Sequence, residues 1–273
     1  MDDVLLVTSR DLPEGEPGGE LLLDACAAAG VSARWVAWDD PDVDWSRASV
    51  AVRSTWDYET RREEFLAWAG SVPRLLNGSE VFVWNTDKSY LVELAEAGVP
   101  VVPSVVAVNA VALADALTRF EKPLLKPTVG AGGRGVHVIE EDSMLPDIGE
   151  APWLVQPLVE SVRTEGEVSV FVLGGEAVSQ VRKLPAGGEV RVHEEYGGHS
   201  TPEPLDPDLA QRARSVVHAV ESLKGWTLHY ARVDLMRHEG EWVLSELEVT
   251  EPGFYLDIVP DNAAAFVERC LVV

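Results

Sequence analysis

The chain has little cysteine and no long apolar segment. Only two cysteines, Cys26 and Cys270, occur among its 273 residues, and no CxxC motif or Cys/His cluster accompanies them. This argues against a disulfide framework and a zinc site, and we expect a reducing, cytoplasmic location. No apolar run is long enough to span a membrane, and the first residues lack the basic start of a signal peptide, so we expect a soluble, unprocessed protein.

Positive charge is also scarce. The chain has 22 Lys plus Arg against 46 Asp plus Glu, which gives a formal net charge of −24. A surface this negative repels nucleic-acid phosphates and anionic lipid headgroups, so we expect neither nucleic acid nor a membrane as a partner. The length predicts two or three subdomains rather than one small module.

The N-terminal part of the chain alternates strand-like and helix-like segments. Strands are predicted over 4–8, 31–38 and 49–53, and helices over 20–29 and 59–69. Such alternation is typical of an α/β layer with a parallel sheet. A further helix over 88–97 ends at Gly98, and the proline-rich stretch after it indicates a subdomain boundary.

Beyond this boundary the strands come in pairs joined by glycine-rich turns. Strands are predicted over 124–126, 135–139, 153–156, 168–173, 177–182, 227–236 and 241–249. One long amphipathic helix over 206–223 interrupts them, and we expect it to cover a sheet. The expected class is therefore α/β with a strand-rich C-terminal part.

A loop dense in glycine follows Lys126. Gly130, Gly132 and Gly135 form a literal GxGxxG, but residues 136–139 predict a strand after the loop, whereas a dinucleotide-binding fold needs a helix there. No GxxxxGK[ST], His-Arg-Asp or Asp-Phe-Gly motif supports a P-loop NTPase or a protein kinase. We expect a hairpin whose backbone N–H groups approach phosphate oxygens, with an ordinary surface hairpin as the alternative.

Three acidic residues lie on two predicted strands near the C-terminus. Glu246 and Glu248 are two apart and share a face, and Asp234 can join them across the hairpin. Carboxylates that converge repel one another unless a cation lies between them, so removal of one should relieve the repulsion, and hard oxygen ligands favour Mg²⁺ or Mn²⁺. The alternative is that the two glutamates line a solvated face.

Only five lysines occur in the chain, and two lie where a triphosphate needs cations. Lys126 stands at the root of the glycine loop. Lys88 stands at a predicted helix start, where the helix dipole also favours anions. A surface-helix lysine is the alternative for Lys88.

In this order the motifs resemble the ATP-grasp superfamily, in its glutathione-synthetase and ribosomal-protein-S6-modification branch. The similarity covers residues 84–260 and includes Ala97-Gly98-Val99-Pro100, Lys126-Pro127 with the glycine loop, Leu154-Val155-Gln156-Pro157, Gly166-Glu167-Val168-Ser169, Arg232-Val233-Asp234 and Glu246-Leu247-Glu248. The resemblance implies an ATP-grasp fold in which two strand-rich subdomains clamp ATP. It implies an N-terminal α/β domain over 1–84, a lid subdomain with the glycine loop over 85–158 and a catalytic subdomain over 159–273.

The resemblance also implies roles for individual residues. It assigns nucleotide binding to Lys88, Lys126, Gly132, Gly133, Glu167 and Arg191. It also assigns the binding of adenine to a hinge formed by Gln156, Pro157, Leu158 and Val159. Arg191 and Arg232, with Lys126, resemble the catalytic residues near the transferred phosphoryl group, where a planar guanidinium stabilises charge spread over several oxygens. Asp234, Glu246 and Glu248 resemble the ligands of two Mg²⁺ or Mn²⁺ ions, with one departure, since related enzymes often have Asn where Glu248 stands.

Two further stretches are similar to the branch that includes the O-ureido-serine cyclo-ligase of cycloserine pathways. Arg53 ends a predicted strand where open α/β sheets bind ligands, so we expect it to pair with a substrate carboxylate and Asp57, beside Tyr58, with an ammonium. A structural Arg–Asp pair is the alternative. Gly197 and Gly198 would let the backbone approach an amino-acid substrate, and we assign no role to His199.

We therefore expect an ATP- and Mg²⁺-dependent ligase that forms a C–N bond in a small amino-acid-like substrate. The carboxylate is activated as an acyl phosphate, and the attacking nitrogen belongs either to a second molecule or to the same one. The alternatives are a phosphotransferase that stops at a phosphorylated product and a nucleotide-binding protein without turnover. A homodimer is the default expectation for a soluble enzyme.

Overall fold

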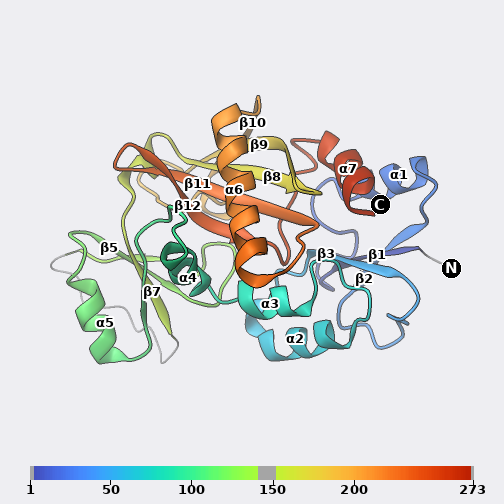
Figure 1. Ribbon diagram of the computed structural model, residues 1–273, viewed down its shortest axis with the longest axis horizontal. Coiled ribbons are helices and arrows are strands. Elements are labelled where there is room, and N and C mark those ends of the chain that lie inside the picture. The colour runs from blue at the N-terminus through green and yellow to red at the C-terminus, as the bar shows by residue number, and fades with distance from the viewer. Residues whose placement is uncertain (1–2, 141–151, 272–273) are drawn as a thin grey trace.

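The computed structural model describes residues 3–140 and 152–271, and within these ranges the chain forms three sheets (Figure 1). The first sheet has the order β2-β1-β3, with β1 at Val4–Thr8, β2 at Ala33–Ala37 and β3 at Ser49–Ser54. Both pairings are parallel, and every side chain of β1 is buried. The predicted parallel sheet is thus confirmed, with α1 (Glu20–Ala28), the 3₁₀ turn η1 (Tyr58–Thr60) and α2 (Arg62–Ser71) between and after its strands.

Two short helices connect this sheet to the rest of the molecule. Helix α3 (Ser79–Asn85) was not predicted from the sequence, and α4 (Tyr90–Glu96) begins two residues after Lys88. The Asn85 amide donates to the carbonyl of Leu247 at 2.7 Å, and the Tyr90 hydroxyl donates to the same carbonyl at 3.0 Å. The boundary expected after residue 84 therefore falls within α3, because this segment packs on the C-terminal sheet and has no linker composition.

The second sheet carries the glycine loop. Its order is β4-β7-β5-β6, all antiparallel, with β4 at Val105–Ala107, β5 at Pro123–Pro127, β6 at His137–Val138 and β7 at Trp153–Pro157. Helix α5 (Ala110–Leu117) covers it and was also missed, because its sequence is nearly all apolar or alanine and has no clear amphipathic period. The loop joins β5 to a strand, as predicted.

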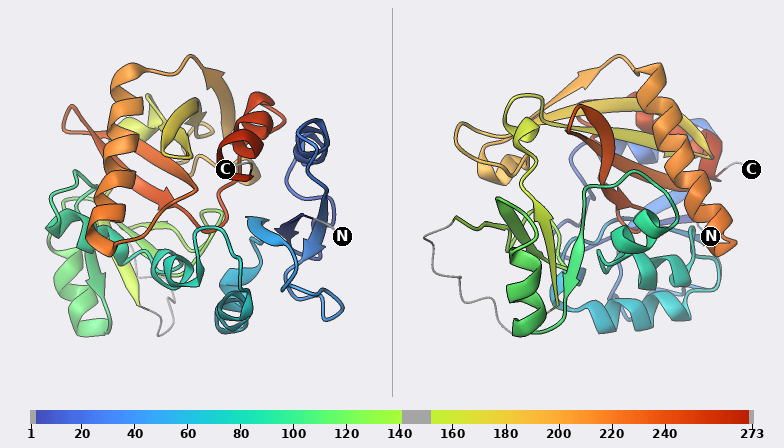
Figure 2. Two further views of the ribbon diagram at one scale, coloured as in Figure 1. Left: turned by 45° about the vertical axis from the view of Figure 1, so that its right-hand side comes forward. Right: turned by 60° about the vertical axis from the view of Figure 1, so that its left-hand side comes forward.

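The third sheet is the largest and has the order β10-β9-β8-β11-β12, all antiparallel. Its strands are β8 (Glu167–Leu173), β9 (Glu176–Leu184), β10 (His199–Glu203), β11 (Tyr230–His238) and β12 (Glu241–Glu248). Helix α6 (Pro207–Lys224) lies across one face, as expected from its apolar stripe, and is capped by Asp206 and Gly225 (Figure 2). The short turns η2 (Glu160–Arg163) and η3 (Glu194–Tyr196) precede β8 and β10.

The chain ends beside its beginning. Helix α7 (Asp261–Phe266) and the π-helical turn η4 (Val267–Leu271) pack against α1, so the C-terminal segment closes the first sheet onto the third (Figure 1). Among the described residues, no helix combines the length and the apolar character that a membrane crossing requires.

One buried asparagine ties the first sheet to the third. Asn77 follows α2, two residues after Leu75, which bridges to Val50 of β3, and it has a positive φ of 64°. Its side-chain amide donates to the carbonyls of Tyr230 at 2.9 Å and Val249 at 2.7 Å. Its side-chain oxygen accepts from the His229 N–H at 2.7 Å. These bonds satisfy buried backbone groups of β11 and of the segment after β12, and so hold the two sheets in a fixed position relative to each other.

We expect Asn77→Ala to lower the free energy of unfolding by about 3 kcal/mol, because it leaves several buried backbone groups without partners. Asn109→Ala is the matched control: Asn109 caps α5 by accepting from the Ala112 N–H at 2.9 Å in an exposed position, and its loss should cost about 1 kcal/mol. Urea unfolding of both variants measures the difference. Equal losses would show that Asn77 does not join the sheets energetically.

Candidate active site

A cavity of about 510 Å³ lies where the three sheets meet, and each of them contributes to its wall. The segments around the first sheet contribute Glu16, Trp56 and Tyr58, the second sheet contributes Lys126, the glycine loop and Gln156, and the third contributes Glu167, Lys183, Arg232, Asp234, Glu246 and Glu248. Residues separated by more than 200 positions thus face one space. The cavity brings together all the nucleotide, catalytic and metal candidates named from the sequence.

The glycine loop roofs this cavity and nearly touches the opposite wall. Gly132, Gly133 and Gly135 all have positive φ, between 61° and 70°. A Cβ at Gly133 would lie 2.9 Å from Nδ1 of His193, which leaves no room for a side chain. Burial lowers the pKa of His193 to about 4, so its ring is neutral at neutral pH, and its buried Nδ1 has no partner among the described residues.

The two candidate phosphate lysines stand side by side below the loop. Lys88 forms an ion pair with Glu246 at 3.2 Å and donates to the carbonyl of Gly130 at 2.5 Å. No described residue accepts a hydrogen bond from the Lys126 ammonium group or pairs with it. Burial and the neighbouring Lys88 lower the pKa of Lys126, whereas Glu246 acts to raise it. An unpartnered cation in a cavity wall favours an anionic ligand.

The acidic residues of β11 and β12 are joined through an arginine rather than left facing one another. Arg232 lies directly opposite Glu248, and Asp234 lies opposite Glu246. The Arg232 guanidinium donates to Asp234 at 2.9 Å and to Glu248 at 2.5 Å. Because the i, i+2 spacing places Arg232 and Asp234 on one face, the guanidinium can reach both Asp234 on its own strand and Glu248 on the next.

Lys183 on β9 completes this network and was not predicted from the sequence. It is almost fully buried between Glu167 at 2.5 Å and Asp234 at 3.3 Å, and these carboxylates raise its pKa although burial opposes them. Ser245 also donates to Glu167, at 2.7 Å. Lys183 was one of only five lysines, and the cross-strand position opposite Glu167 was the signal that could have identified it.

Negative charge is crowded at this end of β12. Burial raises the pKa of Glu248 to about 8 and that of Glu251 to about 7, and nearby Glu246 adds to both rises. The pKa of Glu246 itself is lowered to about 2, because Lys88 and Lys126 outweigh its burial. Carboxylate oxygens in such surplus are the donor set that a hard divalent cation binds.

The expected metal cluster is nevertheless not preassembled. Within residues 3–140 and 152–271 no three Asp, Glu, His or Cys side chains stand close enough to form a cation site. Arg232 holds Asp234 and Glu248, and Lys88 holds Glu246. The chemistry of the oxygen donors therefore fits a divalent cation. To bind them, the cation would have to displace Arg232 and Lys88 from the carboxylates.

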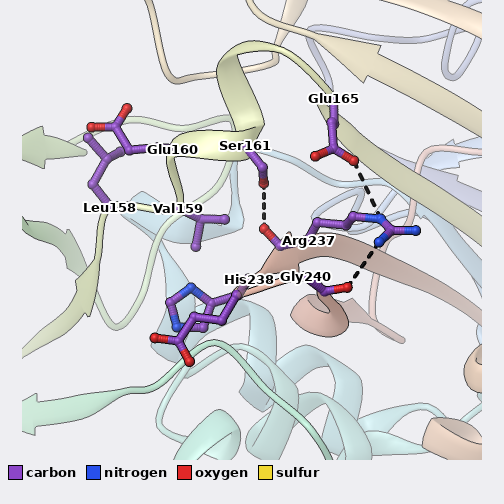
Figure 3. A pocket seen from close by; sticks show the side chains of 9 residues that line it. Leu158, Val159, Glu160, Ser161, Glu165, Arg237, His238 and Gly240 are labelled. Carbon is purple, nitrogen blue, oxygen red and sulfur yellow. Dashed lines mark hydrogen bonds and ion pairs between the residues drawn. The ribbon is translucent and has the colours of Figure 1, made fainter.

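The hinge, residues 156–159, begins with the last two residues of β7 and lies between the large cavity and a smaller one. Gln156 donates to the Ser104 hydroxyl at 2.8 Å, and the Leu158 N–H donates to the carbonyl of Lys122 at 2.7 Å. Leu158 and Val159 line both cavities, the second of about 390 Å³. In the smaller cavity the Arg237 side chain spans from Glu165 to the carbonyl of Gly240, outside the large cavity (Figure 3).

The other nucleotide candidate, Arg191, lies in the wall near the loop. It pairs with Glu189 at 2.6 Å and lies over the ring of Tyr196, 3.5 Å from its centroid. The hydrogen bond from Arg191 lowers the pKa of Glu189 to about 2. The guanidinium is thus held in place while remaining on the cavity side.

The structure places one of the substrate candidates in the cavity wall and the others outside it. Tyr58 lines the cavity, whereas Asp57 accepts from Trp38 Nε1 at 3.1 Å and Gly197 and Gly198 lie outside the wall. Arg53 has no exposed surface: it pairs with Glu16 at 3.3 Å and lies 3.4 Å from the centroid of the Phe254 ring. In this arrangement the expected contact between Arg53 and a substrate carboxylate has no path, because Glu16 stands in front of it.

Two acidic residues at this end were missed. Glu16 lines the cavity and accepts from the Phe254 N–H at 2.5 Å, and burial raises its pKa. Glu251 also lines the wall. Glu16 lies in a Pro/Gly loop with no motif, and Glu251 lies three residues after Glu248, out of phase with the alternation of Glu246 and Glu248, so neither has a clear signal in the sequence.

Two family models together match most of the chain. The model of the N-terminal domain of D-cycloserine synthetase DcsG matches residues 4–77, and that of the ATP-grasp domain of prokaryotic glutathione synthetase matches residues 90–262. The chain belongs to the ATP-grasp ligases. It is accordingly an enzyme that uses ATP, and divalent metal is general in this family.

Individual ATP-grasp relatives also match the chain over nearly its whole length. The cycloserine biosynthesis protein DcsG of Streptomyces lavendulae is 31% identical over 294 residues, which cover 98% of this chain and 95% of the relative. The crystal structure of D-cycloserine synthetase DcsG superposes with a TM-score of 0.86 at 29% identity, covering 97% of each chain. D-alanine–D-alanine ligase from Bacillus anthracis, at a TM-score of 0.67 and 12% identity over 100% of this chain and 97% of its own, shows the shared fold.

We expect Asp234→Asn to destabilise the ligand-free ATP-grasp enzyme by about 3 kcal/mol, since it leaves Arg232 and Lys183 buried with less opposing charge. This is the opposite sign from the relief of repulsion that three facing carboxylates would predict. The control Asp115→Asn removes an exposed partner of Arg119 and should change stability by less than about 1 kcal/mol. A melting curve without nucleotide that is unchanged or shifted upward in Asp234→Asn would refute the network.

Proposed function

We propose that the chain closes a ring in an O-ureido-serine-like amino-acid derivative by activating its carboxylate with ATP. The likeness to DcsG over nearly the whole chain carries this proposal, because it includes the N-terminal domain as well as the nucleotide-binding part. In the structure that domain supplies Glu16, Trp56 and Tyr58 to the cavity. A cavity of this size, shared with a nucleotide, suits a small substrate.

The residues of the nucleotide end have separable roles in this proposal. Lys88 and Lys126 bind the phosphates beneath the glycine loop, with Gly132 and Gly133 allowing close approach. Residues 156–159 hold the adenine and Glu167 the ribose. Asp234, Glu246 and Glu248 would hold the divalent cations, Mg²⁺ or Mn²⁺ and two in number, which neutralise phosphate charge when bound.

At the reacting end, Arg232 and Arg191 stabilise the charge on the oxygens of the transferred phosphoryl group and then of the acyl phosphate. Tyr58, Glu16 and Glu251 surround the amino-acid part, and the carboxylates favour its ammonium. Arg53 acts behind Glu16 by holding it in the wall. The roof formed by the glycine loop excludes water, which would otherwise hydrolyse the acyl phosphate.

Broader features complete the proposal. In this proposal residues 1–84 form the N-terminal domain, residues 85–158 the lid subdomain and residues 159–273 the catalytic subdomain. A reducing cytoplasm suits the two free, buried cysteines. A homodimer is proposed on general frequency alone and is checked by light scattering.

ADP release with Mg²⁺-ATP tests the function. The D and L forms of O-ureido-serine are offered singly, and amino acids and dipeptides singly and in pairs, with mass detection of products. ADP formed with one compound alone, together with a cyclic product, is the expected outcome. ADP only with a pair indicates intermolecular ligation, a stable phosphorylated product indicates a phosphotransferase, and tight ATP binding without ADP formation indicates a protein without turnover.

We expect Arg232→Lys to lower kcat by about 100-fold, because a point charge cannot replace the planar fork that bonds Asp234 and Glu248 and faces the phosphoryl oxygens. Arg237→Ala is the control on the same strand, since Arg237 points into the smaller cavity (Figure 3). Steady-state kinetics on both variants, with melting curves to check folding, measures the effect. Similar kcat values for the two variants would remove Arg232 from the reaction.

We expect Lys126→Ala to weaken ATP binding by about tenfold, because it removes a cavity cation that has no partner among the described residues. Lys224→Ala is its control, since Lys224 pairs with Glu93 at the surface and should leave ATP affinity unchanged. Titration calorimetry with Mg²⁺-ATP measures both. Unaltered affinity in Lys126→Ala would place the phosphates elsewhere.

A further inference from the structure

A carboxylate of the N-terminal domain grips the glycine loop from outside the cavity. Glu59 lies in η1, one residue after Tyr58, and its Oε2 accepts from the backbone N–H of Ala131 at 2.7 Å. Its Oε1 accepts from Nε of Arg134 at 2.5 Å, so one carboxylate binds two points of the loop. Glu59 is 15% exposed and does not line the cavity.

These contacts join segments that are more than 70 positions apart. Arg134 also donates to the carbonyl of Trp56 at 3.5 Å, and hydrogen bonding with Glu59 raises its pKa while nearby Glu195 and Tyr196 add to the rise. The inner side of the loop meets the other wall, where Gly133 packs on His193. The loop is therefore held between the N-terminal domain and the segment that joins β9 to β10.

A loop with this much glycine needs such attachments to stay in one place. Glycine has more backbone freedom to lose than any other residue, so an unattached loop samples many positions. A charged acceptor on a backbone N–H and a charge-assisted pair to arginine are among the stronger single contacts available to it. Removing either contact shifts the population away from the closed position.

We propose that Glu59 is a positioning residue that holds the glycine loop closed over the cavity and thereby shields the activated carboxylate from water. It acts through Ala131 and Arg134 and touches no reacting group. Because Trp56 and Tyr58 line the substrate end, the same short segment, residues 56–59, both faces the substrate and fastens the roof. The shielding step rests on the proposed ligase function, whereas the grip on the loop does not.

Limited trypsin digestion tests the grip directly. Between residues 127 and 162 the sequence offers trypsin only Arg134, and the bond after Lys126 is protected by Pro127, so a cut in the loop is identified by its fragment masses. We expect Glu59→Gln to speed cleavage after Arg134 by about fivefold to tenfold, since the amide keeps an oxygen for Ala131 but loses the charge that holds Arg134.

Glu64→Gln is the matched control, because Glu64 pairs with Arg61 on the exposed face of α2 and makes no contact with the loop. It should be cut at the wild-type rate. Arg134→Lys keeps both the charge and the trypsin site but loses the second donor to Trp56, so it should lie between wild type and Glu59→Gln. The double variant should exceed Glu59→Gln only slightly, since the bond that Arg134→Lys removes in addition, to the carbonyl of Trp56, is long at 3.5 Å.

The ratio of ADP released to product formed tests the shielding. Wild type should release about one ADP per product, and Glu59→Gln should release at least about two, because water reaches the activated carboxylate. The KM for ATP should change less than this ratio. A variant that is only less stable would form less ADP and less ligated product in equal proportion, so the ratio of ADP to product would not change. Melting curves identify such a variant.

Cleavage and ratio that both stay at wild-type values would overturn the proposal, as would an equal change in Glu64→Gln. Faster cleavage with an unchanged ratio would overturn the proposal that the hold on the loop shields the activated carboxylate. If wild type forms no ligated product at all, the proposed function fails, while the digestion still decides whether Glu59 holds the loop.

Discussion

The structure depends on burying charges of both signs on one face of the third sheet. Arg232 and Lys183 pair with Asp234, Glu167 and Glu248, so two cations offset part of the charge of three carboxylates in a region with little access to water. Each charge alone would be costly to bury, so the position of every side chain is constrained by the others. This constraint explains why the carboxylates are held apart in the ligand-free enzyme and why a cation entering the site must exchange partners with Arg232 and Lys88.

The cavity exists only because three separate sheets close around it. The third sheet supplies the charged side chains, the second supplies the loop and residues 156–159, and segments around the first supply Glu16, Trp56 and Tyr58. Their relative placement rests on polar contacts between segments far apart in sequence, such as those of Asn77, Asn85 and Glu59. An ATP-grasp enzyme can thus retain one nucleotide chemistry and change its substrate by changing the first domain.

The substrate end has several acidic side chains, and the buried Arg53 does not line its wall. Arg53 is stacked on Phe254 and neutralises Glu16 from behind, which leaves a carboxylate rather than a guanidinium at the wall. Glu251 adds a second carboxylate whose pKa is raised by burial to about 7. An amino-acid derivative with a free ammonium suits such a wall better than a dicarboxylate does.

The sequence by itself determined the class of fold and the family, and it predicted a set of nucleotide-binding candidates that line one cavity, because these depend on local order along the chain. The parallel strands, the strand after the glycine loop, helix α6 and the alternation around Asp234 and Glu246 are all short-range patterns. Lys183, Glu16, Glu59 and the burial of Arg53 were decided only by the tertiary structure. Their partners lie tens to hundreds of residues away, and an ion pair or a buried guanidinium leaves no periodic trace in the sequence.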